Sequence, residues 1–303
     1  MTDRRLQVFH AVAKHLSFTK AADALFMTQP AVTAQVRHFE ELYGTRLFDR
    51  AQGRILLTAA GAMALEYAER ILAQSAELDH RLRESSGEIA GLLVVGASTT
   101  IADFLLPQVF GEFKARHPMV KPRLFVANSE TVQDWVTART LDLGFIEGDS
   151  HLPTLASDAC CEDELRVMCA PSHPLASQRM VLPAALVEHP YISREPGSGT
   201  REVVGHYLQK AGVAYDALQV AMEVGSPEAI KGLVATGMGF AILSRTSVTK
   251  EIRLGLLVEV PLAPPLVRHM SVVYPKERFQ SRMVNAFVEF AKAKLSAAQQ
   301  GER

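Results

Sequence analysis

Residues 17–43, SFTKAADALFMTQPAVTAQVRHFEELY, constrain the fold most, because they predict two short helices joined by a tight turn. Ser17 is a good N-cap for the first helix, and small side chains four and five residues later let another helix pack closely. Thr28 is expected to cap the second helix. Its first turn tolerates Pro30, because an amide group at that position has no intrahelical acceptor.

The second helix is predicted to have an apolar face and a separate polar face. The apolar residues recur at i, i+4 and i+7 and are Val32, Val36 and Phe39. The polar face lies about 100° or more away and carries Gln29, Thr33 and Arg37. In a major groove Gln can pair with adenine, Thr can offer its hydroxyl or methyl group, and Arg can bind guanine or phosphate. The pattern favours the recognition helix of a helix-turn-helix, although the spacing alone also fits an ordinary amphipathic helix pair.

The segment after this helix predicts a short β-hairpin. It reads GTRLFDR at 44–50 and GRILLT at 53–58, and its arginines are Arg46, Arg50 and Arg54. Such a hairpin suits a wing that lies along a phosphate backbone. The expected phosphate contacts are Ser17, Thr19, Thr28, Arg50 and Arg54, and Pro30 is assigned to the same DNA-binding surface.

Residues 9–50 carry the pattern FxxVAxxxSFTxAAxxLxxTQPAVTxQVRxxExxxGTRLFDR, followed by a Gly, an LTxAG motif and a long helical stretch. On these residues the chain resembles the LysR-type transcriptional regulators, and the match extends over residues 1–58. The resemblance implies a mixed fold with an N-terminal winged helix-turn-helix over 1–58 and a linker helix and hinge over 59–88. It also implies a C-terminal bilobed α/β effector-binding domain, like a periplasmic binding protein, over 89–303.

Many relatives carry Arg or another polar residue at the position of Ala34, so fewer side chains are expected to read bases there. The distribution of charge agrees with DNA binding by the N-terminal part. Residues 1–60 hold 8 Lys and Arg against 5 Asp and Glu, whereas the remainder holds 24 against 28. One such unit would bind DNA weakly, so we expect a dimer that reads two half-sites of a pseudo-palindromic operator. RNA polymerase is a further candidate partner.

The chain of 303 residues is long enough for two or three domains, and its 48% hydrophobic and 21% charged residues are ordinary for a globular protein. No secretory segment and no stretch of roughly 20 apolar residues is found, which favours the bacterial cytoplasm and no membrane partner. The cysteines are Cys160, Cys161 and Cys169. They form neither a disulfide framework nor a CxxC zinc motif, so we expect inert thiols; a redox-sensing role, found elsewhere in the family, is the alternative.

A helix of about 25 residues is predicted from Ala59 to Arg83, capped by Thr58. Its apolar stripe consists of Leu65, Ala68, Leu72, Ser75 and Leu82, near heptad spacing, with Ile71 and Leu78 beside it. Pairing with the same helix of a second subunit would bury this stripe. The resemblance implies an antiparallel linker-helix homodimer and a homotetramer, and docking on the chain's own effector domain is the alternative.

After Gly91 strand-like and helical patterns alternate, which predicts a doubly wound parallel sheet. One continuous helix is expected over Ile101–Arg116. We expect two α/β lobes joined by two crossing segments near residues 161 and 269: lobe 1 (residues 89–161 and 269–303) and lobe 2 (residues 162–268).

Ligands of such sheets bind at the C-terminal ends of strands, near helix N-termini. The polar residues expected there are Ser98, Thr99, Thr100 and Ser129 in lobe 1 and Arg194, Ser198, Gly199, Thr200, Arg201 and Ser226 in lobe 2. The segment 193–201 combines glycines, hydroxyls and two arginines, so it predicts a cradle for an oxyanion or carboxylate. A plain strand-to-helix loop, capped by Thr200 and with Arg201 on the surface, is the alternative.

These polar stretches resemble those of the sulfur-assimilation, sulfite-response and Calvin-cycle regulators within the family. The resemblance implies a small anionic effector, such as sulfate, sulfite, a small carboxylate or a phosphorylated metabolite, and no cofactor or metal. An aromatic or other organic acid is the alternative effector.

Enzyme classes are disfavoured by the motifs. Around Ser198 the Gly-x-Ser-x-Gly elbow lacks its first glycine, because Pro196 stands there. The glycines of residues 232–239 lack the Lys-Ser/Thr of a P-loop, and HExxH is missing from the sequence. A transport-type binding protein without a regulatory role fits residues 92–303 but not the first 58.

Overall fold

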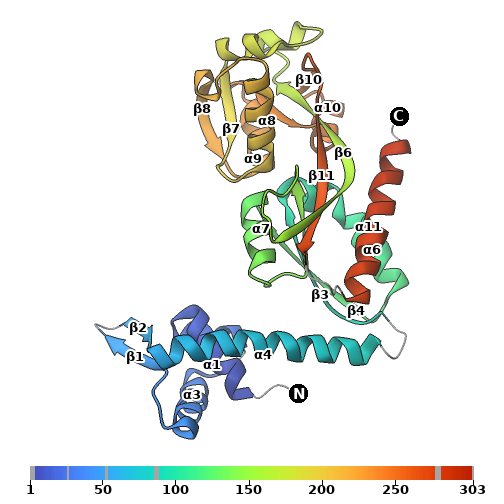
Figure 1. The fold of residues 1–303 in the computed structure, drawn as a ribbon. Helices are drawn as coiled ribbons and strands as arrows, with labels where there is room; N and C mark the ends of the chain where they lie inside the picture. Colours follow the sequence, from blue (N-terminus) through green and yellow to red (C-terminus); the bar gives the residue numbers. More distant parts are fainter. Residues whose placement is uncertain (1–3, 26, 52–53, 85–88, 277–280, 302–303) are drawn as a thin grey trace. The chain divides into compact units, whose positions relative to one another are not determined.

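The structure is a computed structural model that describes residues 4–25, 27–51, 54–84, 89–276 and 281–301. The chain divides into two compact units, Met1–Glu88 and Ile89–Arg303, which are coloured blue to teal and teal to red in Figure 1. Each unit has its own hydrophobic core.

The N-terminal unit is a winged helix-turn-helix, as predicted. Its elements are α1 (Arg4–His15), α2 (Phe18–Leu25), α3 (Gln29–Tyr43), β1 (Phe48–Ala51), β2 (Arg54–Leu57) and α4 (Ala59–Glu84). The apolar face of α3, consisting of Val32, Val36 and Phe39, is buried against α1 and α2 together with Phe9. The strands β1 and β2 form the antiparallel hairpin. The periodicity of α3 therefore placed its two faces correctly.

Two of the three expected helix caps make a side-chain hydrogen bond. The Lys20 amide donates to Ser17 Oγ over 3.2 Å, and the Gly61 amide donates to Thr58 Oγ1 over 2.9 Å. Thr28 occupies the N-cap position of α3 with extended backbone, as expected, but its side chain makes no capping hydrogen bond. Pro30 lies in the first turn of α3, as expected.

The predicted stripe on α4 is partly buried within its own unit. Leu65 and Ala68 pack against the core of the N-terminal unit, and Leu82 lies outside the residues whose side chains are described. Among the described side chains of α4, the large exposed apolar ones are Met63, Tyr67, Ile71 and Leu78, which are 46–60% exposed; of these, Ile71 and Leu78 were expected beside the stripe. The helix therefore presents an apolar face shifted from the predicted one.

The C-terminal unit contains strands and helices in alternation. Lobe 1 is built from β3 (Gly91–Ser98), α5 (Thr99–Phe104), α6 (Leu106–Arg116), β4 (Val120–Ala127), α7 (Ser129–Thr137), β5 (Leu143–Glu147) and α11 (Arg282–Gly301). Lobe 2 contains β7 (Pro190–Arg194), α8 (Gly199–Lys210), β8 (Gln219–Val224), α9 (Pro227–Ala235), β9 (Ala241–Ser244), α10 (Thr249–Arg253) and β10 (Val258–Val260). Four short 3-10 helices lie in lobe 2 at Pro174–Ser177, Pro183–Glu188, Tyr215–Ala217 and Thr246–Val248.

Two long strands, β6 (Leu155–Cys169) and β11 (Leu266–Pro275), are the crossing segments. They pair with each other in antiparallel fashion and run between the lobes in Figure 1. The main sheet has the order β10-β6-β11-β5-β3-β4, with β9 also on β6. The prediction of a parallel sheet is therefore correct in part: among the described strands β3 with β4, β3 with β5 and β7 with β8 run parallel, whereas the pairs made by β6 and β11 are antiparallel.

The single helix expected over residues 101–116 is broken at Leu105. Pro107 has no amide hydrogen to donate to the carbonyl four residues earlier, so α5 ends and α6 begins there. The break leaves α5 as one short turn after the strand-end hydroxyls. Lobe 1 is held together by Phe113, Phe145 and Phe287, all at most 1% exposed.

Candidate functional site

The polar face of α3 is exposed and partly pre-arranged by its own hydrogen bonds. Gln29 Nε2 donates to Thr33 Oγ1 over 3.1 Å, and Thr33 Oγ1 donates to the Gln29 carbonyl over 3.0 Å. The Gln29 amide keeps its oxygen and a second N–H for an outside partner. This is the donor and acceptor pair that an adenine edge requires.

Arg37, the third residue of that face, has a partner on the same helix. Its Nε donates to Glu41 Oε1 over 2.9 Å, with side chains 79% and 58% exposed. An exposed i,i+4 pair contributes about 0.3–0.5 kcal/mol, so phosphate or guanine can displace Glu41.

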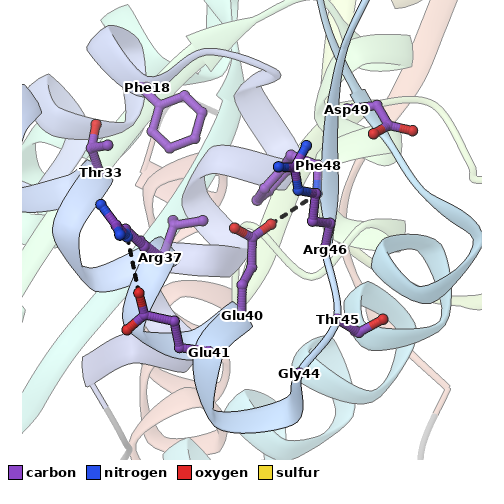
Figure 2. A pocket seen from close by; sticks show the side chains of 11 residues that line it. Phe18, Thr33, Arg37, Glu40, Glu41, Gly44, Thr45, Arg46, Phe48 and Asp49 are labelled. Atoms are coloured by element: carbon purple, nitrogen blue, oxygen red, sulfur yellow. Dashed lines mark hydrogen bonds and ion pairs between the residues drawn. The ribbon is translucent and has the colours of Figure 1, made fainter.

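A hollow of about 720 Å³ lies beside this face, between α3 and the start of β1 (Figure 2). Its wall contains Glu40, whose Oε1 accepts hydrogen bonds from the amides of Leu47 (2.7 Å) and Phe48 (3.2 Å). Figure 2 shows Glu40 pointing toward β1, while Glu41 pairs with Arg37. Glu40 thus attaches the wing to the recognition helix. Glu40 was not among the predicted site residues, although it is the Glu that stands four residues before the GTRLFDR segment.

The other residues that the sequence predicts to contact DNA are distributed as follows. Thr19, Thr28 and Pro30 are exposed, and Ser17 is half-buried. The backbones of Arg50 and Arg54 lie in β1 and β2, but their side chains fall outside the part of the chain that the structure describes.

In the C-terminal unit, the polar strand ends of both lobes meet around Glu147, the last residue of β5. Its carboxylate accepts from the Thr200 amide (2.8 Å), from Thr200 Oγ1 (2.9 Å) and from Ser98 Oγ (3.3 Å). Glu147 was not among the predicted site residues. The N-terminus of α8, where we expected an outside anion, is therefore occupied by the protein's own carboxylate.

Arg268 on β11 joins this carboxylate to the crossing strands. Its guanidinium lies 3.2 Å from Glu147 Oε2, donates to Thr200 Oγ1 over 2.8 Å, and donates to Asp163 Oδ2 over 2.8 Å. The Arg268, Glu147 and Asp163 side chains are at most 5% exposed. Burial alone raises the pKa of Glu147, but the positive charge of Arg268, and then that of Arg194, outweighs burial and lowers the pKa. Glu147 is therefore an ionised, buried carboxylate.

The two predicted arginines have partners of their own. Arg194, 3% exposed, forms a bidentate ion pair with the carboxylate of Glu195 and also donates to Thr99 Oγ1 of lobe 1 over 3.3 Å. Arg201 binds the Arg194 carbonyl and Glu223. The charge of Arg201 is therefore paired within lobe 2, on the side of β8.

The loop before α8 touches lobe 1 closely. The amide of Glu130 donates to the Gly197 carbonyl over 3.1 Å. A Cβ on Gly199 would lie 2.6 Å from Glu147 Cβ and 2.7 Å from Ser129 Oγ, so the approach requires glycine. Ser198 Oγ is buried and lacks a hydrogen-bond partner among the described residues. We call the group of Ser98, Thr99, Ser129, Glu147, Arg194, Ser198, Thr200 and Arg268 the strand-end cluster. Within it, the hydroxyl of Ser198 is an unused donor and acceptor.

Two other expected residues have structural roles or are buried. Ser226 is exposed and caps α9 by accepting from the Ala229 amide over 3.3 Å. Thr100 is buried at the start of α5.

The cysteines are free thiols. Burial raises the pKa of Cys160 to about 11, that of Cys161 to about 12 and that of Cys169 to about 11. Thiols with such pKa values hold almost no thiolate at neutral pH, which disfavours a redox-sensing role.

Within the described residues, His, Cys, Asp and Glu form no group of three or more that could hold a metal ion. Among the helices described, none combines the length and apolar character needed to cross a membrane.

Comparisons with known proteins identify the family of each part of the chain. Residues 4–62 match the family model described as bacterial regulatory helix-turn-helix protein, lysR family, and residues 86–296 match the LysR substrate binding domain. An Escherichia coli K12 protein called uncharacterized HTH-type transcriptional regulator YeiE is 36% identical over 290 residues, which are 96% of each chain. The RuBisCO operon transcriptional regulator of Acidithiobacillus ferrooxidans is 32% identical over 301 residues, 99% of this chain and 96% of that one.

Among solved structures, the regulatory domain of Synechocystis PCC6803 CcmR in complex with 2-PG is 28% identical, with a TM-score of 0.62. The similarity covers 68% of this chain and 97% of that one. These relatives are regulators and not enzymes. With both domains matched in order along the chain, this protein belongs to the LysR family of DNA-binding transcriptional regulators and carries an effector-binding domain.

Proposed function

We propose that a small anionic effector binds between the lobes at the strand-end cluster and thereby alters how the regulator engages DNA. One observation carries the proposal: the amide and the hydroxyl of Thr200 already donate to a carboxylate, that of Glu147. A helix N-terminus with a converging hydroxyl is a general oxyanion site, and here its geometry is complete. Ser198 Oγ, buried without a described partner, supplies a further group for a ligand.

An effector anion must compete with Glu147 for Thr200. Displacement of Glu147 would break its contact with Arg268, which stands on the crossing strand β11. Because Arg268 also binds Asp163 on β6, the change would reach both strands that connect the lobes. Differential affinity of the effector for the two arrangements then supplies the switching free energy.

The relatives support an anion without identifying it. The CcmR regulatory domain, 28% identical, was solved with 2-PG, an anionic phosphate ester. A RuBisCO operon regulator among the relatives fits the Calvin-cycle branch of the resemblance. Sulfate, sulfite and small carboxylates are the other members of the proposed class.

A second candidate is an effector that carries an ammonium or another donor group as well as an anion. It is favoured by the two buried carboxylates, Glu147 and Asp163, which face one buried guanidinium of Arg268. A ligand donor could take over part of the hydrogen bonding to Glu147 without displacing it.

The test is calorimetric titration and thermal unfolding of the full chain against sulfate, sulfite, phosphate, 2-phosphoglycolate and O-acetylserine, with benzyl alcohol as a neutral control. A ligand present at about 100 times its Kd adds about 2.7 kcal/mol, or a few degrees in Tm. We expect one anion to raise Tm, and Thr200→Val, which keeps the shape but removes the hydroxyl, to abolish the rise. Thr236→Val, an exposed threonine on α9's C-terminal side, is the matched control. Stabilisation by a neutral compound alone would refute an anionic effector.

We further propose that α4 mediates the homodimer and that Gln29, Thr33 and Arg37 read the operator. The support for dimerisation is the exposed face of Met63, Tyr67, Ile71 and Leu78. Tyr67→Glu should convert the full chain to monomers in analytical ultracentrifugation. An unchanged sedimentation coefficient would remove α4 from the interface.

A further inference from the structure

A groove on lobe 2 lies outside the strand-end cluster and shares no residue with it. It has a volume of about 460 Å³ and runs between one face of α8 and the beginning of β11. The residues on which the argument rests are Val203, His206, Tyr207, Lys210, Pro264 and Val267; these six define the α8 groove.

A hydrogen bond joins the two walls of the α8 groove. Tyr207 Oη donates to the Pro264 carbonyl over 2.8 Å, which ties α8 to the segment preceding β11. Tyr207 is 9% exposed, whereas Val267 is 49% exposed and faces outward. The groove is therefore preformed and open, so binding would not lose conformational entropy by ordering its walls.

The lining of the α8 groove combines apolar side chains with basic groups and holds no acidic side chain. Val203, Val267 and consecutive prolines offer apolar surface, and a proline has no amide hydrogen to donate. The polar groups at the rim are the ammonium of Lys210 and the imidazole of His206, and no Asp or Glu is among the lining residues. In the described part of the chain, Lys210 has no ion pair or side-chain hydrogen bond, so its charge is available.

We propose that the α8 groove is a second small-molecule site, for a monocarboxylate with an apolar body. The carboxylate would pair with Lys210, and the body would lie on Val203, Val267 and Pro264. The strand-end cluster differs from it, because buried charged and hydroxyl groups meet there and offer no apolar surface for the body of such an acid. Its volume falls within the range of small-ligand pockets.

The test is calorimetric titration of the full chain with benzoate, using benzyl alcohol as the matched neutral compound. Wild type is expected to bind benzoate and to bind benzyl alcohol more weakly. Lys210→Met should weaken benzoate binding about fivefold, as expected for one partly exposed ion pair. Val267→Trp, which fills the groove from its exposed side, should abolish it. Lys250→Met, an exposed lysine on α10, is the control and should change nothing.

Variants at the strand-end cluster distinguish this site from the proposed effector site. Thr200→Val should leave benzoate affinity as in wild type. If Thr200→Val abolishes benzoate binding while Lys210→Met and Val267→Trp do not, benzoate uses the strand-end cluster and the α8 groove proposal is wrong. Absence of benzoate binding to wild type at millimolar concentration would also overturn it.

Discussion

The polar face of α3, which we propose reads DNA, and the strand-end cluster both depend on polar side chains, but they are built in opposite ways. The polar residues of α3 are exposed, and their hydrogen bonds join residues four apart in sequence. In the strand-end cluster the side chains are buried, and the Thr200–Glu147 and Arg268–Asp163 hydrogen bonds join residues 53 and 105 positions apart. The difference fits the proposed roles, because a surface that reads DNA must keep its groups available, whereas a switch needs groups whose rearrangement changes distant parts of the domain. The predictions below test that contrast.

The largest effect is expected from Arg268→Met. The substitution leaves Glu147 and Asp163 as buried carboxylates without their shared cation, which costs about 3–5 kcal/mol. Urea unfolding should show this loss in the transition of the effector-binding domain. Arg37→Met on the exposed face of α3 is the control and should cost less than about 1 kcal/mol. Equal losses for the two variants would contradict the contrast.

A smaller effect is expected from Glu40→Ala, because the two hydrogen bonds that Glu40 accepts are only partly buried. The amides of Leu47 and Phe48 lose a charged acceptor, which costs about 1.5–3 kcal/mol in the N-terminal unit. Thermal unfolding should show a lower Tm, and affinity for duplex DNA should fall because the wing is no longer attached to α3. Glu41→Ala, the neighbouring acid, should leave Tm almost unchanged. A greater loss of Tm for Glu41→Ala than for Glu40→Ala would contradict the assignment of the supporting role to Glu40.

Acid should weaken the effector domain through Glu147. Its pKa is lower in the folded protein than in the unfolded chain, so the unfolded state binds the proton more tightly. The stabilisation is fully present above the unfolded pKa, near 4.5, and is lost as pH falls through the folded pKa. Denaturant unfolding between pH 7 and pH 3 should show this loss, with a shallower dependence in Glu147→Gln. Parallel curves for the two proteins would mean that Glu147 does not contribute.

The smallest effect concerns phosphate contacts of the wing. Arg50→Ala and Arg54→Ala should each lower the slope of log affinity against log salt by about 1 on a random-sequence duplex. Lys121→Ala, on an exposed position of β4, should leave the slope unchanged. A wild-type slope in the Arg50 and Arg54 variants would remove them from the DNA interface.

Local patterns accounted for much of the fold. The faces of α3, the wing, the long α4 helix and the order of strands and helices follow from periodicity, caps and turn residues acting within a few positions. Errors arose where a contact from elsewhere decided the outcome. Leu65 and Ala68 were assigned to an intersubunit stripe but pack within their own unit. The parallel-sheet prediction was correct only in part because β6 and β11 pair with each other over a long sequence separation.

Motifs and short-range periodicity in the sequence therefore predicted the family, the two faces of α3 and the alternation of strands and helices, since these features follow from residues that are close together in the chain. The tertiary structure alone decided which groups meet between the lobes. Glu147 ends an apolar strand, LGFIE, with no local sign of a function, and becomes central because β5 ends opposite the first turn of α8. Arg268 and Asp163 meet because β6 and β11 set them at one register position. Burial then forces these charges to pair, a constraint that residue spacing cannot express.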